Sequence, residues 1–316
     1  MNVSRRSWLQ QAGAMGAVFA ADSALSAAPR PLPPDIIDCH THFYDPTRKE
    51  GVPWPGKQDS VLYRPVLPDE FQKLTKPQGV TGTIVVEASP WVEDNQWLLD
   101  LAAKQPFIVG LIGNLKPGSD DFVKNVERFT AYRKFRGIRL NVNDLKNGLE
   151  QSTYVDHLRV LSLLQLTVDV NGGPETPAVV AKLAKALPNL SIVINHCGNL
   201  RIDGEEPPAD WLAGMQAAAE HKHVYCKVSA LVEATGKREQ DAPQDLNFYR
   251  PVLDALWKTW GVHRVIYGSN WPVCSRAASY QTVFDIVNKY TAARSQVAHE
   301  AFFSQNSIAA YRWKKT

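Results

Sequence analysis

The chain has few cysteines and little net charge for its 316 residues. Its four cysteines, Cys39, Cys197, Cys226 and Cys274, include no Cys-x-x-Cys pair, and each lies within or directly after an apolar run. This pattern predicts buried thiols rather than a disulfide framework. The net charge of +3 is small and no run of lysine and arginine forms a basic stripe, so we expect no nucleic-acid partner.

Two further absences reduce the number of possible folds. No Gly-x-Gly-x-x-Gly motif follows the first predicted strand, which gives a dinucleotide-binding fold little support. The sequence also has no internal repeat of fixed period and no low-complexity tract. A hydrophobic content of 44% and a charged content of 21% are typical of a soluble globular protein, and the length allows one large domain or two small ones.

Residues 1–28 are typical of a twin-arginine signal peptide. The arginine pair lies in Ser4–Gln10 (SRRSWLQ), an apolar segment rich in Gly and Ala follows at Ala12–Ala21, and Ala24–Ser26 is a suitable cleavage tripeptide. The apolar segment is short for a bilayer span, and an N-terminal anchor or a disordered tail is the alternative. We therefore expect a periplasmic mature protein without a membrane partner. Residues 29–34 form a Pro-rich linker.

Short apolar runs alternate with helical patterns across residues 35–316. The predicted strands are Asp35–His40, Thr83–Ala88, Phe107–Leu115, Gly137–Val142, Leu166–Val170, Ser191–Asn195, Val224–Ser229 and Val265–Gly268. Apolar residues at three- and four-residue spacing predict helices that include Asn95–Ala103, Phe122–Tyr132, Val155–Leu164, Ala178–Ala186 and Pro251–Trp260. Eight such units predict a parallel sheet closed into a single-domain (β/α)8 TIM barrel, with an open doubly wound sheet as the alternative.

Two histidines stand at the end of the first predicted strand, in Ile36–His42 (IIDCHTH). Side chains alternate across a strand with period two, so His40 and His42 point the same way. Two converging neutral imidazoles suit a divalent metal or a polarised carbonyl. The motif is short, and the alternative is that one histidine caps the strand while the other is solvated.

Polar residues follow nearly every predicted strand. The carboxyl ends of barrel strands meet at one rim, which is where such folds place their active sites. Polar groups gathered there are costly unless they converge on a ligand or on one another, so we expect a small-molecule site. The residues concerned are Glu87, Ser89, Asn114, Arg139, Asn141, Asp169, Asn171, Asn195, His196, Lys227, Ser229, Ser269 and Asn270.

Three motifs occur in a telling order: Asp38–Phe43 (DCHTHF), His196–Gly198 (HCG) and Tyr267–Cys274 (YGSNWPVC). Together they resemble the amidohydrolase superfamily, in particular the amidohydrolase-related branch that contains sugar-lactone hydrolases. The resemblance extends from about Asp35 to Trp313. It implies a (β/α)8 barrel in which His40, His42 and His196 face one site, where they hold a divalent metal, zinc being expected, or polarise a carbonyl directly.

One position departs from the family pattern. The strand-eight residue that activates water is usually an aspartate, and here it is Asn270. An amide accepts no proton at neutral pH and is a poor metal ligand. Glu87 is the expected replacement base; its alternative is an ion pair with Lys227 or Arg139. Arg139 and Lys227 are expected to stabilise an oxyanion or to bind a substrate carboxylate.

The residues expected to contact substrate are Trp91, Asn141, Ser229 and Trp271, although each tryptophan is equally able to serve in packing. The resemblance implies a hydrolase that opens a lactone, most simply one derived from a sugar. A decarboxylase on the same barrel and a binding protein that lost its chemistry through Asn270 are the alternatives. A homodimer is possible for such a barrel.

Overall fold

The computed structural model describes residues 32–314, so the predicted signal peptide lies outside the described residues. Eight parallel strands follow one another in a single sheet in sequence order. A parallel bridge between Thr41 and Trp271 joins the first strand to the segment after the eighth, which closes the sheet into a barrel. The strands are β1 Ile37–Thr41, β2 Gly82–Val86, β3 Ile108–Gly113, β4 Phe135–Asn141, β5 Thr167–Asn171, β6 Ser191–Ile194, β7 Val224–Val228 and β8 Val265–Tyr267.

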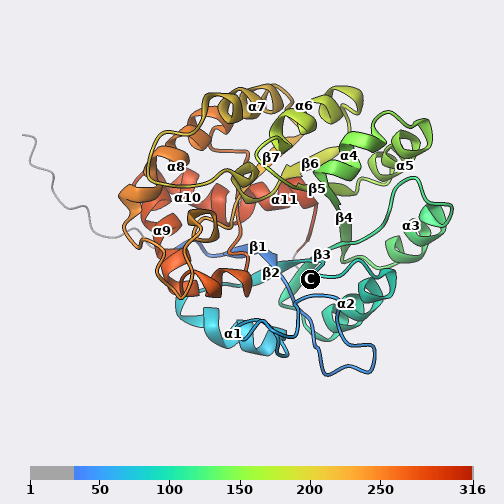
Figure 1. The fold of residues 1–316 in the computed structure, drawn as a ribbon, viewed down its shortest axis with the longest axis horizontal. Coiled ribbons are helices and arrows are strands. Elements are labelled where there is room, and N and C mark those ends of the chain that lie inside the picture. Colours follow the sequence, from blue (N-terminus) through green and yellow to red (C-terminus); the bar gives the residue numbers. More distant parts are fainter. Residues whose placement is uncertain (1–31, 315–316) are drawn as a thin grey trace, which may run out of the picture. The chain divides into compact units, whose positions relative to one another are not determined.

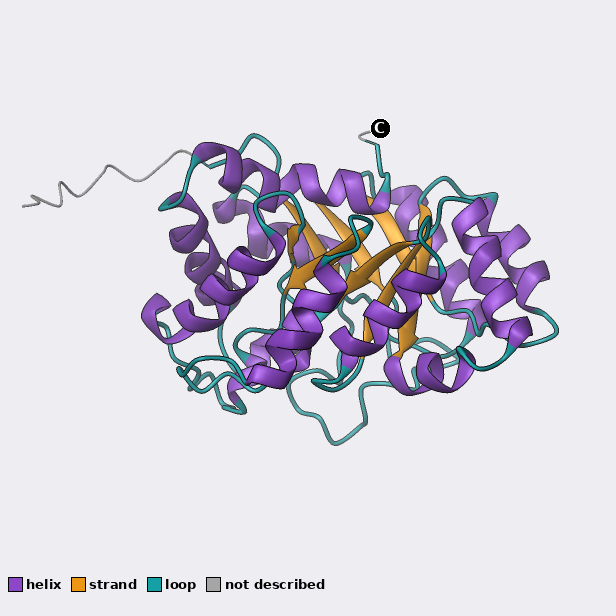
Figure 2. Cartoon of the chain, turned by 90° about the horizontal axis from the view of Figure 1, so that it is seen from above, coloured by secondary structure: helices purple, strands orange, loops and turns teal. Residues whose placement is uncertain are grey.

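Helices surround the strands on the outside of the barrel (Figure 1 and Figure 2). They are α1 Pro68–Thr75, α2 Val92–Lys104, α3 Phe122–Thr130, α4 Val142–Gly148, α5 Ser152–Leu163, α6 Thr176–Ala186, α7 Ala209–Ala219, α8 Leu246–Trp260, α9 Tyr280–Ala292, α10 Gln296–Glu300 and α11 Asn306–Tyr311. Short turns are η1 Lys76–Gln78, η2 His196–Asn199, η3 Glu233–Thr235, η4 Val273–Arg276 and η5 Ala301–Gln305. The predicted (β/α)8 barrel is therefore confirmed.

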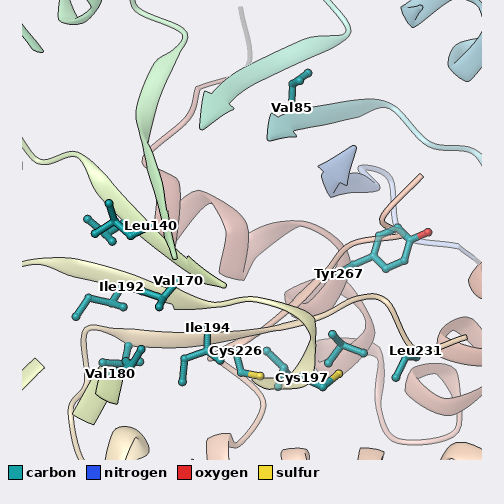
Figure 3. Close-up of a cluster of buried hydrophobic side chains, with 14 of the residues drawn as sticks. Val85, Leu140, Val170, Val180, Ile192, Ile194, Cys197, Cys226, Leu231 and Tyr267 are labelled. Atoms are coloured by element: carbon teal, nitrogen blue, oxygen red, sulfur yellow. The ribbon is translucent and has the colours of Figure 1, made fainter. Parts of the chain in front are cut away.

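The strands are apolar because both of their faces are buried. On the outer face, Leu140, Val170, Ile192 and Ile194 pack under the helices together with Val180 of α6 (Figure 3). On the inner face a second cluster fills the barrel, made of Ile37, Cys39, Ile84, Val86, Ile112, Val193, Ile266, Ala310, Tyr311 and Trp313. Burial on both sides explains why the strands read as continuous apolar runs rather than as alternating ones.

The C-terminal helix contacts the amino ends of two strands. Thr167 and Ser191, the first residues of β5 and β6, both donate hydrogen bonds to the Ala310 carbonyl at 2.7 and 2.9 Å. Tyr311 then enters the inner cluster. The opposite ends of the strands are left for the site.

The four cysteines are buried, free thiols, as predicted. Among residues 32–314, none of the helices has both the length and the apolar character that a bilayer span requires.

Candidate active site

Three imidazoles lie together at the carboxyl ends of the strands. The ring of His40 is centred 5.0 Å from that of His42 and 4.4 Å from that of His196. All three are buried, with 0%, 4% and 8% of their surface exposed. β1 supplies the first ring and precedes the second directly, while His196 opens the turn η2. Gly198 in that turn has φ +69°, and a Cβ there would meet Met215 and Pro177 within 3 Å, so the turn requires glycine.

The hydrogen bonds of His40 define its tautomer. Lys227 is fully buried, and its ammonium donates to Asp169 Oδ2 at 2.7 Å and lies 3.3 Å from His40 Nδ1. An ammonium paired with a carboxylate has only hydrogens to offer, so Nδ1 is the acceptor. The ring proton is then on Nε2, which is buried and has no hydrogen-bond partner among residues 32–314. His40 therefore presents an unused N–H donor.

His42 is held in the opposite tautomer. Its Nδ1 lies 2.9 Å from the Val86 carbonyl, which can only accept, so Nδ1 carries the proton. Burial, aided by the charge of Arg139, lowers the pKa of His42 to about 3. The ring is therefore neutral at pH 7, and Nε2 offers a lone pair. This nitrogen lies 3.3 Å from Asn270 Oδ1.

Asn270 connects His42 to a carboxyl group that sequence reasoning missed. Its backbone has φ 62°, a left-handed conformation that asparagine tolerates well. Its Nδ2 donates to Glu233 Oε1 at 2.7 Å. Glu233 lies in η3 after β7, and burial raises its pKa to about 7. The available signal was a single acidic residue in an apolar stretch, 230–234, directly after a strand.

Glu87 forms an ion pair with Arg139. Arg139 Nε donates to Glu87 Oε1 at 2.7 Å, and Nη2 donates to the Glu87 carbonyl at 2.9 Å. This is the alternative that the sequence left open for Glu87. The role of Glu87 as a base stays a prediction.

A cavity of about 820 Å³ opens at the carboxyl ends of the neighbouring strands β3, β4 and β5. Glu87 and Arg139 line it, together with residues from the ends of β3, β4 and β5 such as Asn114, Asn141 and Asn171. None of the three histidines is among its lining residues. Arg139 relates the two regions, because its charge contributes to the lowered pKa values of His40, His42 and His196.

The structure places the four predicted substrate contacts in different parts of the molecule. Ser229 Oγ lies 2.8 Å from His196 Nδ1, and Asn141 lines the cavity while capping α4 through Asn143 N. Trp91 precedes α2, is 41% exposed and does not line the cavity. Trp271 is buried against Phe43 and Phe71. The structure thus brings Ser229 to the histidines and Asn141 to the cavity, but brings neither tryptophan to them.

The donor set does not fit a divalent metal in this arrangement. Within residues 32–314, no three His, Cys, Asp or Glu side chains are placed to hold a metal ion together. His40 Nε2 carries a proton rather than a lone pair, and the strand-eight position offers a neutral amide. Lys227 and Arg139 add positive charge beside the rings. These features oppose a second cation.

Comparison with known proteins agrees with this fold. The profile of the family described as amidohydrolase matches residues 37–313. The chain is 30% identical over 246 residues to an L-fucono-1,5-lactonase of Burkholderia ambifaria, covering 77% of this chain and 82% of that one. It is also similar to an amidohydrolase of Burkholderia multivorans solved with bound HEPES, at 25% identity and a TM-score of 0.80, covering 88% and 99% of the two chains.

The same Burkholderia multivorans amidohydrolase was also solved with bound zinc, and that structure matches this chain with a TM-score of 0.75 at 25% identity, again covering 88% and 99%. The family match covers most of the chain, from residue 37 to residue 313. The chain therefore belongs to the amidohydrolase family and is a hydrolase.

Proposed function

We propose that this hydrolase opens a lactone, a cyclic ester, by attack of water on the ring carbonyl. One observation carries the proposal: two adjacent imidazoles are held in opposite tautomers. His40 offers an N–H donor and His42 offers a lone pair, with ring centres 5.0 Å apart. A donor that polarises a carbonyl beside an acceptor that takes a proton from water is what ester hydrolysis needs.

The proposed steps use these two rings. The lactone carbonyl oxygen accepts from His40 Nε2–H, and the charge of Arg139 stabilises the oxyanion that develops. Water forms a bond to the carbonyl carbon while its proton moves to His42 Nε2. Collapse of the intermediate breaks the ring C–O bond, and the leaving alkoxide takes that proton from His42. The product is an open-chain hydroxy acid, which ionises and releases a proton.

Lys227 acts on this reaction through His40. Its ammonium is paired with Asp169 and fixes the proton of His40 on Nε2. Glu87 is the second candidate for proton acceptor. Its Oε1 is bound to Arg139, which leaves Oε2 for that role.

The cavity supports a substrate with several hydroxyl groups. Its wall carries five asparagines, and a primary amide both donates and accepts hydrogen bonds as a sugar hydroxyl does. A sugar-derived lactone is therefore the favoured substrate, which agrees with the activity named for the Burkholderia ambifaria relative. The asparagines are Asn114, Asn125, Asn141, Asn147 and Asn171.

A divalent metal, zinc first, is the cofactor to test, because a similar structure holds zinc. When bound, such an ion would supply a polarised carbonyl or a more acidic water. The tautomer of His40 and the amide at position 270 disfavour it here. No proposed step depends on it.

Hydrolysis of a panel of aldonolactones, followed by proton release, tests the proposal. We expect turnover by the purified protein, and we expect it to persist after dialysis against a chelator. His42→Gln should lower kcat on the order of 100-fold, the contribution of a general base. A folded protein that opens no lactone, or that releases CO₂ from aromatic acids, would refute the proposal. Loss of activity with the chelator and recovery with zinc would refute the metal-free route.

A further inference from the structure

The side chain of Asn270 has two different ends of nearly equal size. In the structure Oδ1 faces His42 Nε2 at 3.3 Å and Nδ2 donates to Glu233 Oε1 at 2.7 Å. Above its pKa of about 7 the carboxylate of Glu233 can only accept, so it selects the end that carries hydrogens. Glu233 therefore determines which end of the amide His42 meets.

The orientation of this amide decides whether His42 can act as a base. In the reversed orientation, Nδ2–H would donate to the lone pair of Nε2 and occupy it. In the observed orientation, two acceptors, His42 Nε2 and Asn270 Oδ1, lie next to each other with no hydrogen between them. Two such acceptors bind one water molecule through its two hydrogens, which leaves a lone pair of the water oxygen free for attack.

We propose that Glu233 is a positioning residue for the lactone hydrolysis: by holding Nδ2 of Asn270, it turns Oδ1 toward His42 and so completes the site that binds the attacking water. This inference rests on the proposed function. It also explains how the family reaction proceeds without the usual aspartate. Asn270 supplies an acceptor, and His42 takes the proton.

The loop that carries Glu233 is well placed to hold this orientation. Ala234 N donates to the Ala230 carbonyl at 3.0 Å, and Ile202 N donates to the Ala234 carbonyl at 3.0 Å, so η3 is tied both to the segment directly after β7 and to the segment after β6. Leu231, two residues before Glu233, belongs to the same buried hydrophobic cluster as Cys197 (Figure 3). The positive charges of Arg238 and Arg276 act on the carboxylate.

Substitution of Glu233 and ¹⁵N NMR of histidine test this inference. Glu233→Ala removes the acceptor, so the amide is free to reverse. We expect kcat to fall on the order of 10- to 100-fold with little change in KM, because misplacement of a positioned group costs about that much. In the alanine variant a ¹⁵N–¹⁵N coupling across a hydrogen bond should appear between Asn270 Nδ2 and His42 Nε2, and it should be absent from the wild type, where Nε2 accepts from water. Glu233→Gln keeps an acceptor oxygen and should recover most of both effects.

Glu206→Ala, which removes an exposed carboxylate from another loop, is the matched control and should change neither readout. The inference is overturned if Glu233→Ala keeps the wild-type kcat and shows no coupling between Asn270 Nδ2 and His42 Nε2. It is equally overturned if Glu233→Gln loses as much activity as the alanine variant while showing no such coupling, since the charge rather than the orientation would then matter. The NMR coupling requires no turnover. A wild-type protein without lactonase activity therefore refutes the proposed function and still leaves the orientation decided.

Discussion

Burying a lysine ammonium costs free energy of desolvation, and in Lys227 this cost accompanies an effect on the neighbouring His40. It pairs with Asp169, whose other oxygen accepts from the hydroxyl of Tyr311 at 2.9 Å. Removing an ion pair from water costs about as much as the attraction returns, so the pair contributes little net stability. Its measurable effect is on His40, since the ammonium directs the proton of that ring to Nε2. The ion pair therefore fixes the tautomer of His40 rather than stabilising the fold.

The two roles considered for Glu87, general base and ion-pair partner of Arg139, predict different losses of kcat when the residue is substituted. Glu87→Gln keeps an oxygen for Arg139 but cannot accept a proton. If Glu87 is the base, kcat falls by a factor of about 10² to 10⁴. We expect a loss of less than about 10-fold, because Oε1 is already bound to Arg139 and His42 offers a free lone pair. Steady-state kinetics on the best lactone decides, and a loss above 100-fold would transfer the base assignment to Glu87.

At the scale of single residues, the sequence predicted which residues form the site better than it predicted which of them contact one another. Period two on β1 is enough to bring His40 and His42 together. Glu233 was missed because its contact with Asn270 joins two loops, and no periodicity relates such positions. Trp271 was expected at the substrate, but burial against Phe43 and Phe71 competes for a large aromatic ring.

Among the elements, β4 and β5 approach each other unusually closely. A Cβ on Gly137 would lie 1.9 Å from the Thr167 carbonyl oxygen of the neighbouring strand. Gly137→Ala should therefore force the strands apart and destabilise the protein by about 3 kcal/mol or more, as severe overpacking does. Arg139 lies two residues further along β4, so activity should fall as well.

Urea unfolding measures this effect, with Gly56→Ala as the control. A Cβ on Gly56 would meet only the side chain of Gln58, at 3.5 Å or more. That variant should change the free energy of unfolding by less than about 1 kcal/mol. Equal stability of the two variants would show that the strands can separate without cost.

All eight predicted strands are present in the structure. They could be predicted because a strand that is buried on both faces has a continuous apolar sequence. The ends were less predictable. Val142 was expected to close the fourth strand, but it begins α4, because the side chain of Asn141 caps that helix through Asn143 N. Loops hold the parts of the site that were not predicted, since loop conformation follows tertiary contacts rather than a repeating pattern.

For the whole molecule, the raised pKa of Glu233 predicts a pH-dependent stability. Its ordinary pKa is 4.5 and its pKa in the folded protein is about 7. Between these values the folded protein keeps a proton that the unfolded chain has lost. The contribution of Glu233 to the free energy of unfolding therefore falls as pH rises through this window. Glu233→Gln removes this loss.

The stability of Glu233→Gln relative to wild type should thus increase between pH 4.5 and pH 7, by an amount on the order of 2–3 kcal/mol, and stay constant above pH 8. The lowered pKa values of His40, His42 and His196 act in both proteins and cancel in the difference. Urea titrations at pH 5 and pH 8 provide the comparison. An identical difference at both pH values would contradict a carboxyl group that stays protonated in the fold.

The contact of Tyr311 with Asp169 ties helix α11 to the inside of the barrel. Asp169 in turn pairs with Lys227, which lies 3.3 Å from His40 Nδ1. A continuous series of contacts therefore connects α11 to an imidazole of the site, although this helix packs at the opposite ends of the strands. Damage to α11 should thus reach the chemistry without any change at the rim that binds the substrate.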